Sequence, residues 1–100
     1  MSEITLSPSI VVPSLSSDEL FLLITDPENK LYEGKIASLS AINEEGLFDI
    51  YPGHAHFISL ITEKVIIYST DNKKKELPVE SAIMKVIDDQ IYIYLGMENI

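Results

Sequence analysis

Short apolar runs separated by turn residues are the feature that most limits how this chain can fold. Phe21–Thr25 is a run of large side chains that ends at Asp26-Pro27-Glu28-Asn29, a sequence typical of a β-turn with Pro at its second position. From Lys35 to Ile42 the side chains alternate between two faces, which is the period of a β-strand. Apolar residues at helical spacing never persist for about three turns. These patterns predict an all-β protein.

The remaining apolar runs complete the expected set of strands. Polar turns separate them, notably at Asp71-Asn72-Lys73 and at Asp88-Asp89. Turn signals recur about every eight to twelve residues, which predicts a small antiparallel β-sandwich or flattened barrel of about eight to ten short strands. The further strands are expected at residues 57–61, 65–69, 76–79, 82–87 and 91–95.

The length of 100 residues suits one domain with a single hydrophobic core. Residues 1–19 are rich in Ser and contain two Pro, so we expect a flexible N-terminal extension with at most one short strand at 9–12. Residues 20–100 are expected to form the compact β-sandwich domain. A chain of this size leaves little room for a deep cleft, which favours a binding or structural module over an enzyme.

The charge of the chain is strongly acidic. Its formal net charge is −9, with seven Lys and no Arg. Nucleic-acid binding depends on clustered cations that contact phosphates and on Arg that reads guanine, so we expect no nucleic-acid partner. Anionic lipid headgroups would repel the same surface, so we expect no direct insertion into lipid.

Cysteine is absent, and no apolar run reaches the ~20 residues that a membrane-spanning helix needs. The first residues also lack the basic segment of a secretion signal and the Arg residues of a transit peptide. A chain without disulfides or thiolate metal sites suits the interior of a cell. We therefore expect an intracellular protein that reaches any membrane through another protein.

The segment from Glu44 to Leu60, EEGLFDIYPGHAHFISL, carries the strongest local signal. Pro52 fixes its own φ for a turn, and Gly53 can adopt the positive φ that a tight bend needs. We therefore expect the residues from Tyr51 to His54 to be held stiffly between two strands. Such a loop either serves only the fold or presents its side chains to a partner, and the residues alone leave both interpretations open.

His54 and His56 form a His-x-His pair whose side chains would point the same way on a strand. A zinc site would need two more ligands, and only carboxylates are available. We expect His54 to form hydrogen bonds in the loop, His56 to be an edge residue, and no metal or cofactor. Asp88-Asp89 suits the turn of a hairpin. The chain has neither a nucleophile elbow nor a phosphate-binding glycine loop, so no catalytic residue is predicted.

The same segment resembles the signature loop of the epsilon subunit of F-type ATP synthases, which is called delta in mitochondria. The family pattern runs roughly Gly-Glu-(aromatic or Leu)-Gly-(Ile or Val)-(Leu or Tyr)-Pro-Gly-His-Ala-Pro and precedes an apolar strand. Phe21–Glu28 and Leu31–Lys35 also resemble the first strands of that family and the turn between them. The matching loop residues are Gly46, Phe48, Ile50, Tyr51, Pro52, Gly53, His54 and Ala55.

The resemblance implies a sandwich of two packed sheets in the central stalk of a rotary motor. In that family the sandwich joins the gamma subunit to the c-ring and catalyses nothing itself. In bacteria it lies at the cytoplasmic face of the inner membrane, as a peripheral part of the F1 sector. One end meets polar c-ring loops, where Glu44, Glu45 and Asp49 would offer carboxylates to an Arg. The residues implied at this contact are Asp49, Tyr51, Pro52, Gly53 and His54.

Tyr92 and Tyr94 alternate with Ile91, Ile93 and Leu95. If the aliphatic residues face the core, both tyrosines lie in line on the outer face of the sheet. Rigid amphipathic rings are common at protein interfaces, although outward aromatic residues also occur without a partner. The resemblance implies that this stripe packs on the gamma subunit.

The chain departs from the family pattern at several positions. Leu47 stands where an acidic residue is usual, Asp49 replaces the second Gly, and His56 replaces the Pro after His-Ala. Replacing Gly by Asp requires a backbone angle that Asp tolerates. Glycines of two later strands are replaced by Thr62-Glu63-Lys64 and by Ser81-Ala82. Many family members continue into a C-terminal helical hairpin that restrains ATP hydrolysis, and we expect this chain to lack it.

The residues and the resemblance together leave three hypotheses. The first is a rotor subunit that couples the gamma subunit to the c-ring during proton-driven ATP synthesis. The second is a free-standing β-sandwich adaptor or regulatory paralogue outside the rotor, which the replaced glycines and the Ser-rich start favour. The third is a small metal-dependent enzyme that uses His54 and His56.

Overall fold

The computed structural model describes residues 12–96, and the strands within them form one seven-stranded sheet. The order of the strands across the sheet is β2-β1-β7-β6-β5-β3-β4. No helix among these residues has the length and apolar character needed to cross a bilayer. The all-β fold class predicted from the sequence is confirmed. The strands are β1 (Leu20–Thr25), β2 (Lys30–Ile36), β3 (Ser38–Asn43), β4 (Gly46–Ile50), β5 (His56–Tyr68), β6 (Lys74–Ile87) and β7 (Gln90–Leu95).

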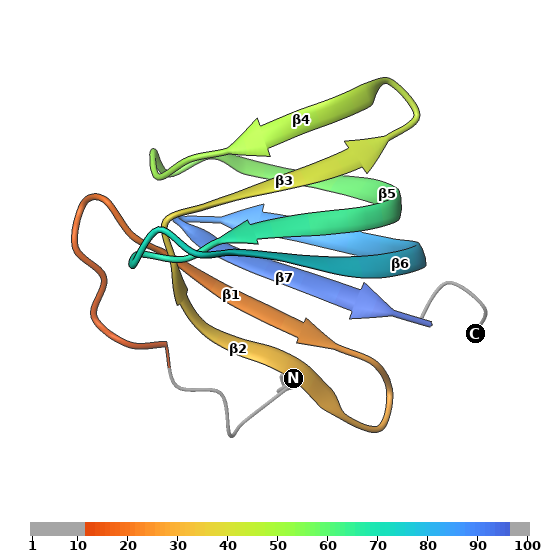
Figure 1. Ribbon diagram of the computed structural model, residues 1–100, viewed down its shortest axis with the longest axis horizontal. Coiled ribbons are helices and arrows are strands. Elements are labelled where there is room, and N and C mark those ends of the chain that lie inside the picture. The colour runs from red at the N-terminus through yellow and green to blue at the C-terminus, as the bar shows by residue number, and fades with distance from the viewer. Residues whose placement is uncertain (1–11, 97–100) are drawn as a thin grey trace, which may run out of the picture.

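Neighbouring strands are antiparallel, except that β1 and β7 run parallel. A parallel pair needs a long connection between its strands. Here the chain from β2 to β6 provides that connection. The pair brings the first and last described strands side by side (Figure 1). The sequence predicted an antiparallel sheet, and this pair is the exception.

The long hairpin of β5 and β6 folds the sheet into two layers. The first half of β5, residues 56–61, pairs with the second half of β6, which continues into β7, β1 and β2. The second half of β5 pairs with β3 on its other side. The register shifts between Thr62 and Glu63, and Figure 1 shows β5 and β6 curving together at one end. The sandwich is therefore built from one continuous sheet.

The described residues contain seven strands, fewer than the roughly eight to ten that turn spacing suggests. The difference arises because β5 and β6 each join two of the predicted strands. Residues 57–61 and 65–69 fall largely in β5, and residues 76–79 and 82–87 fall in β6. The polar residues Thr62-Glu63-Lys64 form the bend of a continuous strand, with Glu63 at a φ of 70°.

The strand predicted from Lys35 to Ile42 is divided between β2 and β3 by a bend at Ala37. Ile36 and Leu39 are both fully buried, and a straight strand with a period of two would place them on opposite faces. The bend carries the chain from one layer to the other, so that both side chains enter the core. The backbone N–H of Ala37 donates to the carbonyl of Tyr68 at 2.8 Å.

The hydrophobic core lies between the two layers. Every strand of the sheet contributes to it or packs against it, which explains why alternation is visible along most of the chain. Burial of each large aliphatic side chain stabilises the fold by about 1.5–3 kcal/mol. The core residues are Leu20, Leu22, Ile24, Ile36, Leu39, Ala41, Ile50, Ile61, Val65, Ile67, Val79, Ala82, Met84, Val86, Ile91 and Ile93.

Residues 12–19 precede the sheet and form no strand. They contain a turn in which Ser16 Oγ donates to Asp18 at 2.6 Å and the N–H of Glu19 donates to the carbonyl of Ser16 at 3.2 Å. The short strand expected at 9–12 lies outside the described residues apart from Val12, which is not in a strand. The flexibility of residues 1–19 stays a prediction.

Candidate functional site

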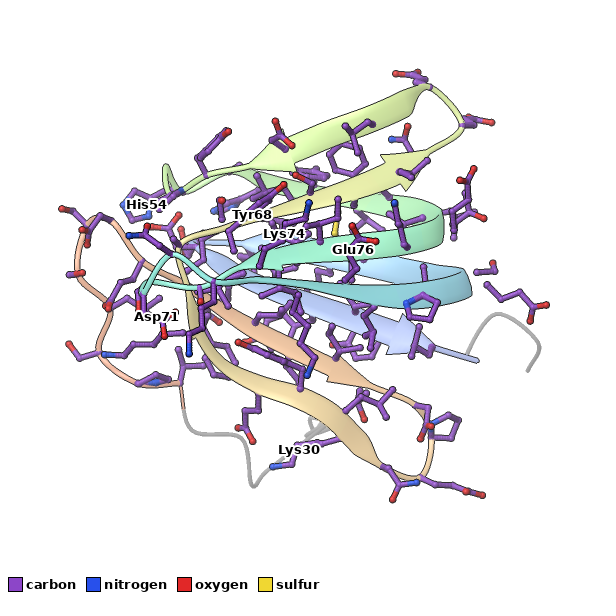
Figure 2. All side chains as sticks on the ribbon, in the orientation of Figure 1. Lys30, His54, Tyr68, Asp71, Lys74 and Glu76 are labelled. Atoms are coloured by element: carbon purple, nitrogen blue, oxygen red, sulfur yellow. The ribbon has the colours of Figure 1, made fainter. Side chains whose placement is uncertain are left out.

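Three turns gather at one end of the sandwich, termed the loop end. They are residues 51–55 between β4 and β5, residues 69–73 between β5 and β6, and residues 88–89 between β6 and β7. Figure 2 shows His54 and Asp71 at this end of the molecule. The β1–β2 turn and the β3–β4 turn lie at the opposite end (Figure 1).

The loop at 51–55 is fixed by the side chain of Asp89. Asp89 Oδ1 accepts the backbone N–H of Gly53 at 2.8 Å and that of His54 at 2.7 Å. The carbonyl of Asp89 accepts the N–H of Phe21 at 2.9 Å. Asp89 thus joins the loop, the β6–β7 turn and the start of β1, and only 6% of the residue is exposed. Charge-assisted hydrogen bonds of this kind are stronger than neutral ones.

The pKa of the Asp89 carboxyl lies below its usual value. Burial on its own would raise this pKa, because it disfavours the charged form. The N–H groups of Gly53 and His54, together with the His54 ring, outweigh burial and favour the carboxylate. His54 Nδ1 lies 3.6 Å from Asp89 Oδ2. Asp89 therefore holds the loop as an anion at neutral pH.

A second His–Asp pair lies beside the first and is exposed. His56 Nε2 is 2.9 Å from Asp88 Oδ1, and both side chains are more than half exposed. Each His therefore faces a different Asp of the same turn. No group of three or more His, Cys, Asp or Glu among residues 12–96 is arranged to hold a metal ion.

The bend of the loop depends on His54 instead of Gly53. His54 has a φ of 61°, whereas Gly53 is outside the left-handed region. A Cβ added at Gly53 would meet no atom within 4 Å. The prediction that Gly53 supplies the positive φ was therefore wrong. A left-handed L residue costs about 1–2 kcal/mol, and the hydrogen bond from His54 N–H to Asp89 helps to offset that cost.

The structure brings together the five residues that the resemblance implied for a partner contact. Four of them are consecutive, from Tyr51 to His54, and directly follow β4, in which Asp49 is the penultimate residue. Tyr51 is 63% exposed. The His54 side chain is 76% exposed, and Pro52 is half-buried. The loop end therefore presents an aromatic ring and an imidazole to solvent on an anchored backbone.

Asp49 lies on the outer face of β4 in an ordinary strand conformation. It is absent from the residues with positive φ, so Asp fits where the family pattern has Gly. Ser40 Oγ donates to Asp49 Oδ1 at 2.5 Å. Asp49, Tyr51 and Lys73 are among the residues that line an open hollow of about 400 Å³. The loop end therefore carries both a carboxylate and a cation next to the exposed ring.

Glu44 and Glu45 lie far from this contact, contrary to the prediction that they would join Asp49. They form the β3–β4 turn, and the five-residue strand β4 separates them from the loop by roughly 17 Å. They line a different hollow of about 460 Å³, next to Ile58 and Leu60. The acidic residues of the loop-end turns and of the adjoining end of β4 are Asp49, Asp71, Asp88 and Asp89.

Tyr92 and Tyr94 lie on the outer face of the layer formed by β2, β1, β7, the second half of β6 and the first half of β5, as the alternation predicts. Ile91 and Ile93 between and beside them are fully buried in the core. Tyr92 OH donates to Gln90 Oε1 at 2.6 Å. Partial burial raises the pKa of both tyrosines, and for Tyr92 the neighbouring Tyr94 adds to the effect. Both rings therefore stay neutral and half-buried.

The sheet register places further apolar side chains beside the two tyrosines. Leu60, Ile83 and Tyr94 form one row across β5, β6 and β7, and Ile58 and Tyr92 flank Lys85 in the next row. Ile58 is 69% exposed and Leu60 is 66% exposed. Together Ile58, Leu60, Ile83, Tyr92 and Tyr94 are termed the outer patch.

The sequence does not single out Ile58 and Leu60, because the apolar run at 57–61 looks buried on both faces. Ser59 interrupts the run on the face that also carries Phe57 and the buried Ile61, so alternation would place Ile58 and Leu60 in the core, and no local signal reveals their exposure. Contiguous exposed apolar side chains of this kind mark interaction surfaces in many proteins.

Residues 19–95 match the family model described as the β-sandwich domain of the ATP synthase delta/epsilon chain. The chain is 30% identical over 79 residues to the ATP synthase epsilon chain of Leptospira interrogans serogroup Icterohaemorrhagiae serovar copenhageni, covering 79% of this chain and 62% of that relative. It is 34% identical over 74 residues to the ATP synthase epsilon chain of a Nitratiruptor species, covering 73% of this chain and 57% of that relative. The chain thus spans 57–62% of the length of these curated relatives.

Two solved structures share the fold at low sequence identity. A chain of the Euglena gracilis mitochondrial ATP synthase, in an assembly of OSCP, F1 and c-ring, is similar with a TM-score of 0.73 at 14% identity, over 95% of this chain and 58% of that one. A chain of the central stalk and c-ring of the Tetrahymena thermophila mitochondrial ATP synthase gives 0.58 at 11% identity, over 75% and 61%. By its match over residues 19–95, this chain belongs to the ATP synthase delta/epsilon family.

Proposed function

We propose that this chain is a central-stalk rotor subunit of an F-type ATP synthase. It couples the gamma subunit to the membrane c-ring during proton-driven ATP synthesis. The observation that carries the proposal is the delta/epsilon family match over residues 19–95. Relatives named ATP synthase epsilon chain and similar structures from c-ring assemblies support it.

The proposed role is mechanical, and the subunit itself catalyses no reaction. A sandwich of densely packed layers transmits load with little deformation. Its working place is the cytoplasmic face of a bacterial inner membrane, where it is a peripheral part of the F1 sector. The bacterial origin of the named relatives supports this location.

The loop end is the proposed contact with the polar loops of the c-ring. Asp49, Tyr51, Pro52, Gly53 and His54 form this contact. The exposure of Tyr51 and His54 on an anchored loop supports the assignment, because a rigid contact loses little conformational freedom on binding. The carboxylates of Asp49, Asp71 and Asp88 favour a basic side chain on the partner.

The outer patch is the proposed contact with the gamma subunit. Tyr92 and Tyr94 are its aromatic part, and Ile58 and Leu60 extend it across β6 to the edge of the layer. Interface cores are rich in aromatic residues, and the two tyrosines among aliphatic side chains support the assignment, although Lys85 lies between Ile58 and Tyr92. The two contacts thus lie on different parts of the sandwich, as a coupling role requires.

Co-expression with the cognate gamma subunit, followed by size-exclusion chromatography, tests the proposal. The two proteins are expected to migrate together. Migration as separate species would contradict the rotor role and favour a free-standing adaptor. Elemental analysis of the purified chain is expected to find no metal, and a retained metal ion would favour the enzyme that uses His54 and His56.

Two exposed leucines provide a matched pair for the gamma contact. Leu60 in the outer patch is 66% exposed, and Leu47 in the other layer is 65% exposed. Leu60→Glu is expected to abolish migration with gamma, whereas Leu47→Glu leaves it unchanged. Equal behaviour of the two variants would show that the outer patch is not the gamma contact.

A further inference from the structure

We propose that Asp89 is the positioning residue of the loop end: its buried side chain sets the conformation in which Tyr51 and His54 meet the partner. The inference rests on the proposed function, because it concerns the loop assigned to the c-ring. Asp89 itself does not reach the partner, since only 8% of its side chain is exposed.

The burial of Asp89 exceeds what the β6–β7 turn requires. Asp88 and Asp89 have φ values of 49° and 66°, and Asn, Asp or Gly at both positions satisfies such a turn. Asp88, at the other position of the same turn, satisfies the turn with a side chain that is 60% exposed. Among residues 12–96, Asp89 is the one ionisable residue that is buried. A buried carboxylate is costly unless it is hydrogen-bonded, so its position points to a role outside the turn.

That role is to hold the loop. Asp89 Oδ1 accepts the N–H groups of two consecutive loop residues, Gly53 and His54. The backbone hydrogen bonds of the turns and loops within residues 12–96 include none from residues 51–55. The surroundings of Gly53 are open. The Asp89 carboxylate and the fixed φ of Pro52 are therefore what restrain the loop.

Asp89 also connects the loop to the strands that carry the outer patch. It directly precedes β7, the strand that carries Tyr92 and Tyr94 of the outer patch. Its carbonyl accepts the N–H of Phe21 in β1. One residue thus fixes the orientation of the loop end relative to the strands that bear the proposed gamma contact.

Amide hydrogen exchange of the full chain, followed by NMR, tests the hold on the loop without any partner. Asp89→Gly keeps the turn angle and removes the acceptor, so the amides of Gly53 and His54 are expected to exchange roughly ten- to a hundredfold faster. Asp89→Asn keeps a carbonyl acceptor and is expected to restore most of the protection. Asp88→Gly is the matched control in the same turn and is expected to change neither amide.

A pH titration followed by NMR supplies a second measurement, because only amides hydrogen-bonded to the Asp89 carboxylate are expected to respond to its protonation. As the pH falls from about 5 to about 2, the amide proton shifts of Gly53 and His54 in the wild type are expected to move together as Asp89 is protonated, and in Asp89→Asn they are expected not to move. Unchanged exchange in Asp89→Gly, or shifts that do not follow Asp89 in the wild type, would overturn the proposal.

Assembly of the variants into the synthase tests the consequence for the partner. Asp89→Gly is expected to lower retention on c-ring-containing membranes about tenfold while it still migrates with gamma, and Asp89→Asn is expected to recover retention. Full retention of a variant with a loosened loop would overturn the positioning role. If the wild type joins neither gamma nor the c-ring, the proposed function and the partner named here are overturned. The hydrogen-exchange data are measured without a partner, so they show separately whether Asp89 restrains the loop.

Discussion

Several non-glycine residues of this sandwich have a positive φ, and they fall into two groups. Asn72, Asp88, Asp89 and His54 are of types that are enriched in the left-handed region. Glu63 is not, and it lies where the fold demands the angle. Asp89 holds His54 in the loop, and the bend between the two layers holds Glu63. The family pattern has a Gly near the latter position, so Glu63 shows that the bend survives without one.

Glu63→Gly is expected to stabilise the isolated chain by about 0.5–1 kcal/mol. Gly removes the cost of a left-handed L residue, and this gain exceeds the loss from its greater freedom in the unfolded chain. Chemical denaturation measures the change. Lys85→Gly, on an exposed β6 position with ordinary φ, is the control and is expected to destabilise by about 0.5–1 kcal/mol. Destabilisation by both substitutions would contradict the account of the bend.

Asp89 gives the fold a defined dependence on pH. Its pKa in the folded chain lies below the ordinary value of 3.8. The carboxylate therefore contributes stability that is fully present above that value and is lost as the pH falls through the folded pKa. The wild type is expected to lose more stability than Asp89→Asn when the pH falls from about 5 to about 2. Parallel losses in denaturation curves of the two proteins would show that Asp89 adds nothing.

Gly53→Val separates folding from docking at the loop end. A side chain at Gly53 meets open space, so the unfolding free energy is expected to change by no more than about 0.5 kcal/mol. In the assembled contact the same side chain is expected to cost about 1–3 kcal/mol as overpacking. Melting curves and retention on c-ring-containing membranes measure the two effects. Equal, large losses in both would mean that the loop serves the fold alone.

At the scale of the strands, the sequence predicts those features that depend on neighbouring residues in the chain. The limits of β1 and β7 and the Asp88-Asp89 turn follow from alternation and turn chemistry. The continuity of β5 does not, because Thr62-Glu63-Lys64 has the composition of a turn and the bend is imposed by packing between layers. The parallel pairing of β1 with β7 joins segments far apart in the chain, and no local pattern reports it.

The site shows the same division between local and distant information. Pro52 and the residues around it predict a stiff loop from the sequence alone. Asp89 contributes to that loop from a turn 36 residues from Gly53, so only the folded chain reveals it. Glu44 and Glu45 are close to Asp49 in the sequence, yet the β3–β4 hairpin places them at the other end of the sandwich.

Adjacent residues of β5 test the orientation of its first half. Ile61 is 1% exposed and Leu60 is 66% exposed. Ile61→Ala is expected to destabilise the chain by about 2–5 kcal/mol because it leaves a cavity in the core. Leu60→Ala is expected to change the stability by no more than about 0.5 kcal/mol. Urea denaturation compares the two, and similar losses would contradict the orientation that defines the outer patch.

The molecule as a whole carries the two proposed contacts on one sandwich. The outer patch lies on a sheet face, and the loop end lies where the β4–β5, β5–β6 and β6–β7 turns meet (Figure 1). Asp89 connects them through β7 and β1. A strong net negative charge of −9 favours basic partner surfaces and disfavours lipid. This arrangement suits a subunit that transmits rotation between two partners.

Cross-linking from single cysteines in the assembled synthase tests the rotor role most directly. The sequence has no Cys, so Tyr51→Cys at the loop end and Glu45→Cys at the opposite end each introduce one reactive group. With a short cysteine-to-lysine cross-linker, Tyr51→Cys is expected to give a product with the c subunit and Glu45→Cys is expected to give none. A c-subunit product from Glu45→Cys alone would contradict the proposed orientation in the rotor. The absence of a product from both variants, in membranes that retain the chain, would contradict it as well.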